Sequence, residues 1–284
     1  MRQNDFPVFG PGSQPAESDS AELDYIPMPS SMSTYSVPEV PEPEAAKALP
    51  KGMAILEQML SQLRKHTGGL NPPINLQGLD AANLDLINQV LGEGDVSITL
   101  EERTFKTQIQ ESVLAGVWRV QSVGETGAIL SDHIEVARIP WAVSERSFES
   151  AQKEVIFDPS TLPDGVMNAP PLLSEINEHI PRVTPDGLSH TINLSLLPQT
   201  EADLAYLQQL LGRGRVTILS RGYGNCRVTS TNTKNVWWVQ YYNSQDTLIL
   251  NTLEIVKVPE VTCAGIEDIV DSAQRLKEIL EVYQ

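Results

Sequence analysis

The chain has 284 residues, 40% of them hydrophobic, which suffices for one large or two small domains and excludes fibrous, collagen-like and wholly disordered proteins. It carries 37 acidic against 20 basic residues, a formal net charge of −17. This charge repels nucleic-acid phosphates and anionic lipid, and it attracts a basic peptide or protein.

Neither a membrane anchor nor a secretion signal is expected. No apolar run reaches transmembrane length, and the first residues lead into glycine, proline and acids rather than an apolar core. Two cysteines, Cys226 and Cys263, are too few for a four-cysteine zinc site or an ordinary iron–sulfur cluster, although one disulfide is conceivable. We therefore predict a cytoplasmic protein with reduced thiols, no cofactor, no nucleic-acid partner and no membrane contact.

Residues 1–45 are rich in proline, serine and acids and show no helical or strand periodicity. Such a segment cannot bury enough apolar surface to offset its ordering entropy, so we predict a disordered tail. Two short apolar islands lie within it, at residues 9–15 and 25–29. They are either plain linker or segments that become ordered on a partner.

An internal repeat follows the tail. Five blocks recur in order at an offset that stays between 118 and 120 residues, which predicts a duplicated module. The matched blocks are Ile74-Asn-Leu76 with Ile192-Asn-Leu194, 84–94 with 204–214, Val96-Ser-Ile98 with Val216-Thr-Ile218, 117–121 with 236–240, and 135–140 with 254–259. The predicted domains are a first module over 46–150, a linker over 151–164, and a second module with a C-terminal helix over 165–284.

Each module is predicted to be of the α+β class: a short strand, a helix, and a meander of three or four antiparallel strands, flanked by extra helices. Asp80 and Thr200 are the expected N-caps of the central helices, and Gly92 and Gly212 suit the left-handed position that ends them. The expected strands are 96–100, 105–112, 117–121 and 134–139, then 216–219, 226–230, 236–242 and 248–258. Flanking helices are expected near 56–63, 172–180 and 266–283. Two similar modules could pack about a pseudo-twofold axis.

The search for catalytic or metal-binding chemistry finds little. The four histidines, at 66, 133, 179 and 190, lack ligand spacing, and no nucleophile elbow or phosphate-binding loop is present. The glycines at 92–94 and 212–214 follow helices rather than strands, so they are interpreted as helix stops. Cys226 is interpreted as a structural thiol, because no base lies near it in the sequence. These observations favour a binding protein over an enzyme, with no catalytic or metal residues assigned.

Aromatic residues gather at 236–242. On a strand, Trp237 shares a face with Val239 and Tyr241, and Trp238 shares the other with Tyr242. The first copy has Trp118 where the second has Trp237, so Trp237 is expected in the core. The first copy has Arg119 where the second has Trp238. Trp238 and Tyr242 therefore lie on the strand face whose residues differ between the two copies. We interpret that face as a protein-contact surface, with internal packing and nucleic-acid stacking as alternatives.

Several strings together resemble the HupH/HyaF family, also called HoxQ, encoded with bacterial uptake [NiFe] hydrogenases. The strings are Gly10-Pro-Gly-Ser-Gln-Pro15, Gly165-Val-Met-Asn168, Ile192-Asn-Leu194, Glu201-Ala-Asp203, Gly222-Tyr-Gly224, Val236-Trp237, residues 255–261 and residues 267–276. The resemblance covers nearly the whole chain and is strongest over 190–276.

The resemblance implies a role in hydrogenase expression or maturation. More narrowly, it implies a cytoplasmic chaperone that holds the iron–sulfur small-subunit precursor, with its twin-arginine signal, before export and assembly. A scaffold joining other maturation factors and a thiol-based redox protein acting through Cys226 or Cys263 are the alternatives. Candidate partner-contact residues are Gly10, Pro11, Gly12, Tyr223, Trp238 and Tyr242.

Overall fold

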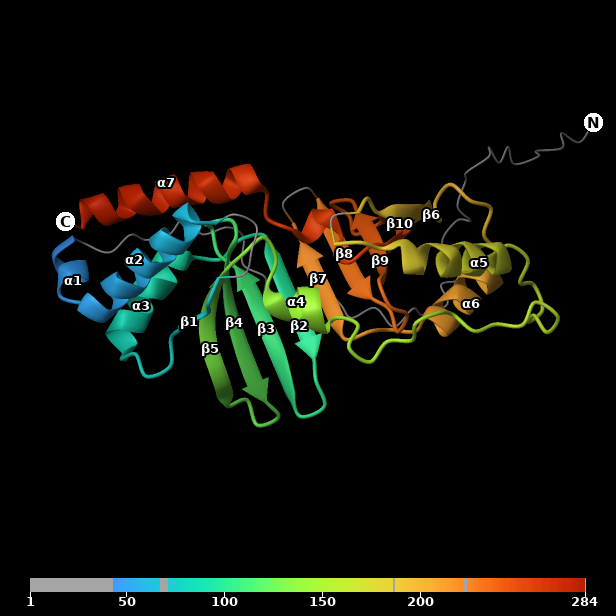
Figure 1. The fold of residues 1–284 in the computed structure, drawn as a ribbon, viewed down its shortest axis with the longest axis horizontal. Coiled ribbons are helices and arrows are strands. Elements are labelled where there is room, and N and C mark those ends of the chain that lie inside the picture. The colour runs from blue at the N-terminus through green and yellow to red at the C-terminus, as the bar shows by residue number, and fades with distance from the viewer. Residues whose placement is uncertain (1–42, 67–70, 186, 222–223, 284) are drawn as a thin grey trace, which may run out of the picture.

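One antiparallel sheet runs through the part of the chain that the structure describes (Figure 1). The structure is a computed structural model and describes residues 43–66, 71–185, 187–221 and 224–283. Nearly all of the tail predicted at 1–45 lies outside these residues. The strands are β1 (Ile74–Asn75), β2 (Val96–Glu101), β3 (Phe105–Glu111), β4 (Val117–Gly124), β5 (Ile129–Val136), β6 (His190–Asn193), β7 (Val216–Ser220), β8 (Asn225–Ser230), β9 (Val236–Tyr242) and β10 (Leu248–Ile255). Their order across the sheet is β1-β5-β4-β3-β2-β7-β8-β9-β10-β6.

The two modules meet at β2 and β7, and the sheet is pseudo-symmetric about that pair. Ile98 pairs with Ile218, its own equivalent in the repeat. The strand order also reads the same from either edge once equivalent strands are matched. The duplicated modules thus form, within one chain, the self-complementary contact of a twofold dimer. This arrangement confirms the prediction of two tandem α+β modules.

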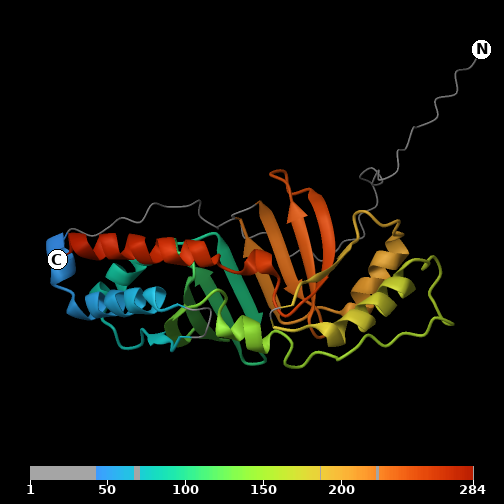
Figure 2. The ribbon, with the colours of Figure 1, turned by 45° about the horizontal axis from the view of Figure 1, so that its top comes forward.

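Helices cover both ends of one sheet face. Helices α2 (Pro50–Arg64) and α3 (Ala81–Leu91) pack on the first module, and α5 (Ala169–His179) and α6 (Glu201–Leu211) pack on the second (Figures 1 and 2). The side chains of cross-strand partners point to the same face of a sheet. Ile134 packs with α2 and α3, and Leu253 packs with α5 and α6. The register across the sheet places these two residues on one face, so both helix pairs lie on the same side. The opposite face carries a central cluster that includes Trp118, Trp237 and residues of the short helix α4 (Trp141–Arg146).

The C-terminal helix α7 (Ile266–Val282) crosses back to the first module. It lies along α2, and its apolar stripe, including Ile269 and Leu276, joins the first module's core (Figure 2). Arg138 Nε also donates to the Ala264 carbonyl at 3.2 Å, just before the helix. The region predicted as a second module therefore ends in a helix that is buried on the first. Its amphipathic pattern predicts a helix, but not which surface the helix covers.

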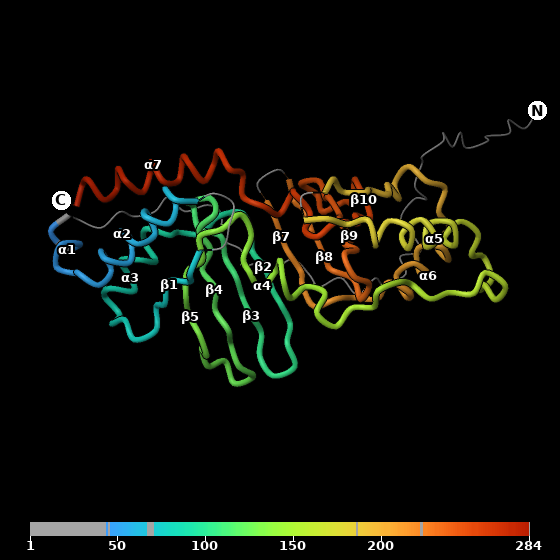
Figure 3. Tube along the Cα trace, viewed as in Figure 1, coloured from blue at the N-terminus to red at the C-terminus, as the bar shows by residue number. Residues whose placement is uncertain are grey.

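The linker makes the reciprocal crossing. Gln152 pairs with Thr233 in a parallel bridge, so the chain leaving the first module runs against the β8–β9 turn of the second. The chain that leaves the second module contacts the equivalent β3–β4 turn, where Ile269 lies against Gly116. The trace in Figure 3 shows both crossings. Each module thus contributes its C-terminal extension to the other, which ties the pseudo-dimer together.

The predicted helix ends are confirmed. Thr200 and Asp203 form a full capping box, and the Asp80 side chain accepts a hydrogen bond from the Asn83 N–H. Gly92 and Gly212 end the same helices with φ of 53° and 62°. Several strand boundaries were wrong: β5 spans Ile129–Val136 rather than 134–139, β4 ends at Gly124 rather than 121, and β10 ends at Ile255 rather than 258. The largest error is the start of β5. Polar residues 131–133 obscure the strand periodicity there, because Arg119 and Gln121 on β4 pair with the buried Asp132.

Candidate protein-contact site

Only part of the predicted contact set can be located. Gly10, Pro11, Gly12 and Tyr223 lie outside the described residues. Trp238 and Tyr242 share one face of β9, and Trp237 points to the other face, where it is fully buried. The prediction that Trp237 belongs to the core is confirmed.

Trp238 and Tyr242 are half-buried rather than fully exposed. The Trp238 ring packs against the core beneath α5 and α6, and its Nε1 donates to Asn251 Oδ1 at 2.6 Å. The Tyr242 hydroxyl donates to Gln240 Oε1 at 3.2 Å, and the Arg227 guanidinium lies 6.0 Å from its ring centroid. Each side chain therefore has an internal partner and is also partly exposed.

Trp141 is the most exposed tryptophan of the chain, although no sequence pattern predicted it as a contact residue. It begins α4 with 46% of its surface exposed, whereas Trp118 and Trp237 are fully buried. Its backbone N–H donates to Glu135 Oε2 at 2.8 Å, which fixes the helix start. A comparison of the two copies could have found it, because no tryptophan occupies the matching position after Pro259.

Two of the strings that carry the family resemblance meet at one buried carboxylate. Asp203 Oδ1 accepts hydrogen bonds from the backbone N–H groups of Met167, Asn168 and Ala169 at 2.8–2.9 Å. Its Oδ2 accepts from the backbone N–H and the hydroxyl of Thr200. Although burial opposes the charged form, these donors lower the pKa of Asp203 to about 2. The strings 165–168 and 201–203 thus form a structural junction that caps α5 and α6 together.

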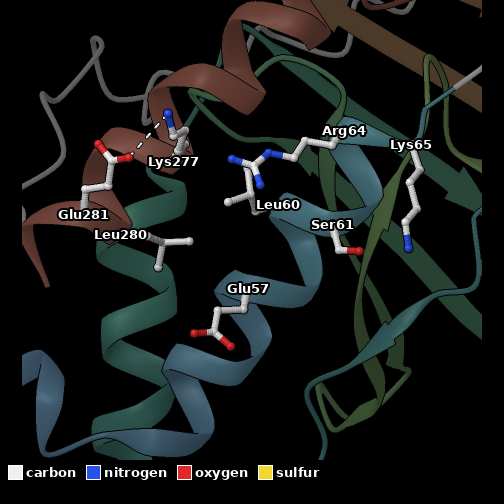
Figure 4. Close-up of a pocket in the computed structure, with 8 residues that line it drawn as sticks. All are labelled: Glu57, Leu60, Ser61, Arg64, Lys65, Lys277, Leu280 and Glu281. Carbon is white, nitrogen blue, oxygen red and sulfur yellow. Dashed lines mark ion pairs between the residues drawn. The ribbon is translucent and has the colours of Figure 1, made fainter. Parts of the chain in front are cut away.

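A groove of about 520 Å³ separates α2 from α7 (Figure 4). Leu60 and Leu280 form its apolar lining, and Arg64, Lys65, Lys277, Glu57 and Glu281 supply both signs of charge. Lys277 and Glu281 form an ion pair at 3.3 Å on the α7 side. The mixture suits a polar surface contact better than a buried small ligand, which needs a mostly apolar enclosure.

The histidines and carboxylates do not gather into a metal site within the described ranges. His179 stacks on His190 with ring centroids 3.4 Å apart, and His190 Nε2 lies 2.7 Å from Glu175 Oε1. His133 pairs with Glu135 at 3.1 Å. Burial lowers the pKa of His66, with the Arg138 charge as a second cause, so the neutral ring is favoured.

Neither thiol is activated. Burial raises the pKa of Cys226 to about 12 and that of Cys263 to about 11. Because the thiolate is the nucleophile, we expect both to react with iodoacetamide at pH 8 at least roughly a hundredfold more slowly in the native protein than in urea. Mass spectrometry after timed quenching measures this. If either cysteine of the native protein were labelled at the rate seen in urea, this would contradict the expectation and would support the thiol-based redox alternative.

Glu111 is another buried carboxylate, and it has no counterpart in the other module. It is 8% exposed, and its Oε1 accepts from the Gly116 N–H at 3.3 Å. Burial, with further contributions from the nearby Asp95 and Asp268 charges, raises its pKa to about 7. Ser230 occupies the equivalent position in the second module. The backbone N–H of Gly214 donates to the Ser230 carbonyl, just as the backbone N–H of Gly94 donates to the Glu111 carbonyl. Glu111 is thus hydrogen-bonded to the turn at Gly116, against which Ile269 of α7 lies.

We expect Glu111→Gln to stabilise the protein at pH 8 but not at pH 4.5. The folded state holds the proton between pH 4.5 and 7 while the unfolded state has released it, so stability falls as pH rises through this window. The full difference is on the order of 3 kcal/mol. Urea unfolding at several pH values measures it, with the exposed Glu101→Gln as control. Parallel pH profiles for wild type and Glu111→Gln would contradict this assignment.

Taken together, the geometry defines a duplicated α+β protein with exposed aromatic and apolar side chains and two thiols whose pKa values are raised by burial. In the parts of the chain that the structure covers, no helix is long and apolar enough to cross a membrane. Residues 49–154 and 166–283 match the HupH hydrogenase expression protein, C-terminal conserved region, so both modules match the same family.

Two hydrogenase-related proteins are similar in sequence to this chain over nearly its whole length. The hydrogenase expression/formation protein HoxQ of Cupriavidus necator is 45% identical, covering 98% of each chain. The hydrogenase-1 operon protein HyaF of Escherichia coli is 33% identical, covering 99% of this chain and 97% of that one. A solved structure of hydrogenase expression protein HupH from Thiobacillus denitrificans is 34% identical over 40% of this chain and 93% of that one, with a TM-score of 0.36. The chain belongs to the HupH/HyaF family of hydrogenase expression/formation proteins.

Proposed function

We propose that this hydrogenase accessory protein is a cytoplasmic chaperone for the iron–sulfur small-subunit precursor of an uptake [NiFe] hydrogenase. It holds the precursor, with its basic export signal, until the subunit is ready for export and assembly. The observation that carries the proposal is the net charge of −17 on a relative of hydrogenase formation proteins, because such a surface attracts a basic segment and speeds encounter with it.

The chemistry of the thiols supports a binding role over a redox role. A redox carrier needs an accessible thiolate, and burial raises the pKa of both Cys226 and Cys263 far above neutrality. The exposed ring of Trp141 and the half-exposed Trp238 and Tyr242 are residue types that dominate protein interfaces. These three side chains, with the unlocated Gly10, Pro11, Gly12 and Tyr223, are the proposed contacts.

A scaffold for other maturation factors is the second candidate, favoured by the pseudo-symmetry. Leu130 and Ile249 occupy equivalent positions at the tips of the β4–β5 and β9–β10 hairpins, and both are exposed. Two equivalent apolar tips offer two equivalent contact points. A stable complex with another accessory protein, but with no hydrogenase subunit, would support this candidate.

A pull-down from hydrogenase-expressing cells distinguishes the two candidates. The full chain serves as bait, once with the complete small subunit and once with its signal deleted. Recovery of the small-subunit precursor without the large subunit, and its loss on signal deletion, is the expected result. Recovery of accessory proteins without any hydrogenase subunit would support the scaffold function instead of the chaperone function.

A further inference from the structure

The two modules differ at the loop that leads into their central helices. Three residues separate Leu76 from Asp80, whereas five separate Leu194 from Thr200. Both leucines are buried, and Asp80 and Thr200 both cap the following helix, so the loops begin and end at equivalent points. The second copy is therefore two residues longer. The fold does not need the extra length, because the first module forms the same elements without it.

The longer loop places apolar side chains in solvent. Leu196 is 80% exposed and Leu197 is 38% exposed. Met167, 72% exposed, lies on the neighbouring loop, because Asn168 Nδ2 donates to the Pro198 carbonyl at 2.6 Å and Thr200 Oγ1 donates to the Gly165 carbonyl at 3.0 Å. We call Met167, Leu196 and Leu197 the leucine-loop patch.

The patch is held in place from beneath. The buried Asp203 carboxylate binds both loops through Thr200, Met167 and Asn168. A preorganised surface loses little conformational entropy on binding, while leucine and methionine side chains can adapt to an apolar partner. The patch lies where α5 and α6 begin, at the end of the molecule remote from α7 (Figures 1 and 2).

Acidic residues border the patch. Asp164 precedes Gly165 and Glu201 follows Thr200, so the hydrogen bond between Thr200 and Gly165 brings both exposed acids to the same edge. Residues 154–181 and 183–212 contain no lysine or arginine. An apolar surface with two exposed acids at its edge fits a partner that is apolar along its length and basic at one end.

We propose that the leucine-loop patch binds an apolar peptide segment with arginine or lysine residues at one end. The patch takes the apolar run, and Asp164 and Glu201 face the cations. A short apolar run preceded by basic residues is the composition of an export signal. The proposal thus rests on the chaperone function above and assigns its signal-binding site.

The test uses the full-length protein and two partners. One partner is the purified small-subunit precursor. The other is a synthetic peptide of two arginines followed by about ten leucine and alanine residues, the composition of a signal's basic and apolar regions. The variants are Leu196→Ser/Leu197→Ser and Asp164→Asn/Glu201→Gln. The matched control is Val270→Ser, which removes an exposed aliphatic residue of α7 at 62% exposure, remote from the patch. Circular dichroism checks that each variant is folded.

The leucine variant is expected to weaken peptide binding at least about tenfold, and the acid variant is expected to weaken it and to reduce its salt dependence. The control leaves binding unchanged. Unchanged affinity in the leucine variant overturns the proposal, as does equal binding of a peptide that starts with two glutamates. Stronger binding to phosphatidylglycerol vesicles, lost in the same variant, would assign the patch to a membrane surface instead.

The two proposals fail separately. If wild type binds the precursor and the leucine variant binds it equally well, the chaperone function stands and the site is wrong. If the wild-type protein binds the peptide through the patch but does not bind the precursor, the patch is a peptide-binding site and the proposed chaperone function is wrong.

Discussion

Asp203→Ala is expected to lower the free energy of unfolding by about 3–5 kcal/mol. The carboxylate accepts from four backbone N–H groups and one hydroxyl, and it is fully buried. Removing it leaves the first turn of α5 and the N-cap of α6 without partners at the same time. Urea unfolding at pH 7 measures the loss.

The matched control is Asp164→Ala, an exposed carboxylate next to the same loop, expected to change stability by less than about 0.5 kcal/mol. Because the pKa of Asp203 is lowered, its contribution is complete above its ordinary value of 3.8 and is lost as the pH falls through about 2. A loss below about 1 kcal/mol at pH 7 would mean that Asp203 does not join the two helices.

Trp237→Ala is expected to cost about 3–5 kcal/mol, because the ring fills the central cluster where the two modules meet. Its Nε1 donates to the Lys257 carbonyl at 3.2 Å, and its ring meets Phe148 edge to face with centroids 5.0 Å apart. The truncation leaves a cavity on the face opposite the helix pairs and an unpaired carbonyl. Thermal and urea unfolding both measure the effect.

The neighbouring tryptophan is the natural control. Trp238→Ala removes a residue of the same size from the same strand but from the other face, where it is only half-buried, so the expected cost is about 1–2 kcal/mol. Equal losses for the two variants would contradict the assignment of faces on β9. A drop in precursor affinity for folded Trp238→Ala, and not for Trp141→Ala, would place the contact on the sheet face of Trp238.

Much of this fold could be predicted from local patterns. The repeat offset predicted the duplication, and capping residues such as Thr200 and stop glycines such as Gly92 predicted the helix ends. The alternation in β9 divided its side chains between two faces, and the match with Trp118 in the first copy predicted that Trp237 is buried. These features depend on residues close in sequence, where spacing and cap chemistry act directly.

What could not be predicted depends on contacts distant in sequence. The stripe on α7 does not reveal that it packs on the first module, and the strand patterns do not reveal that β2 pairs with β7. The exposure of Trp238 was overestimated because no local pattern shows the helices that cover it. The role of Asp203 required residues 167–169 to be brought to it from more than thirty positions away.

The most direct test of the chaperone proposal is a calorimetric titration of the purified full-length protein with the purified small-subunit precursor. Parallel titrations use the precursor without its signal and the large subunit alone. The proposal predicts saturable binding of the precursor, weakened at least about tenfold by removal of the signal, and no binding of the large subunit. The absence of saturable binding to the precursor, or equal affinity for the large subunit, would contradict it.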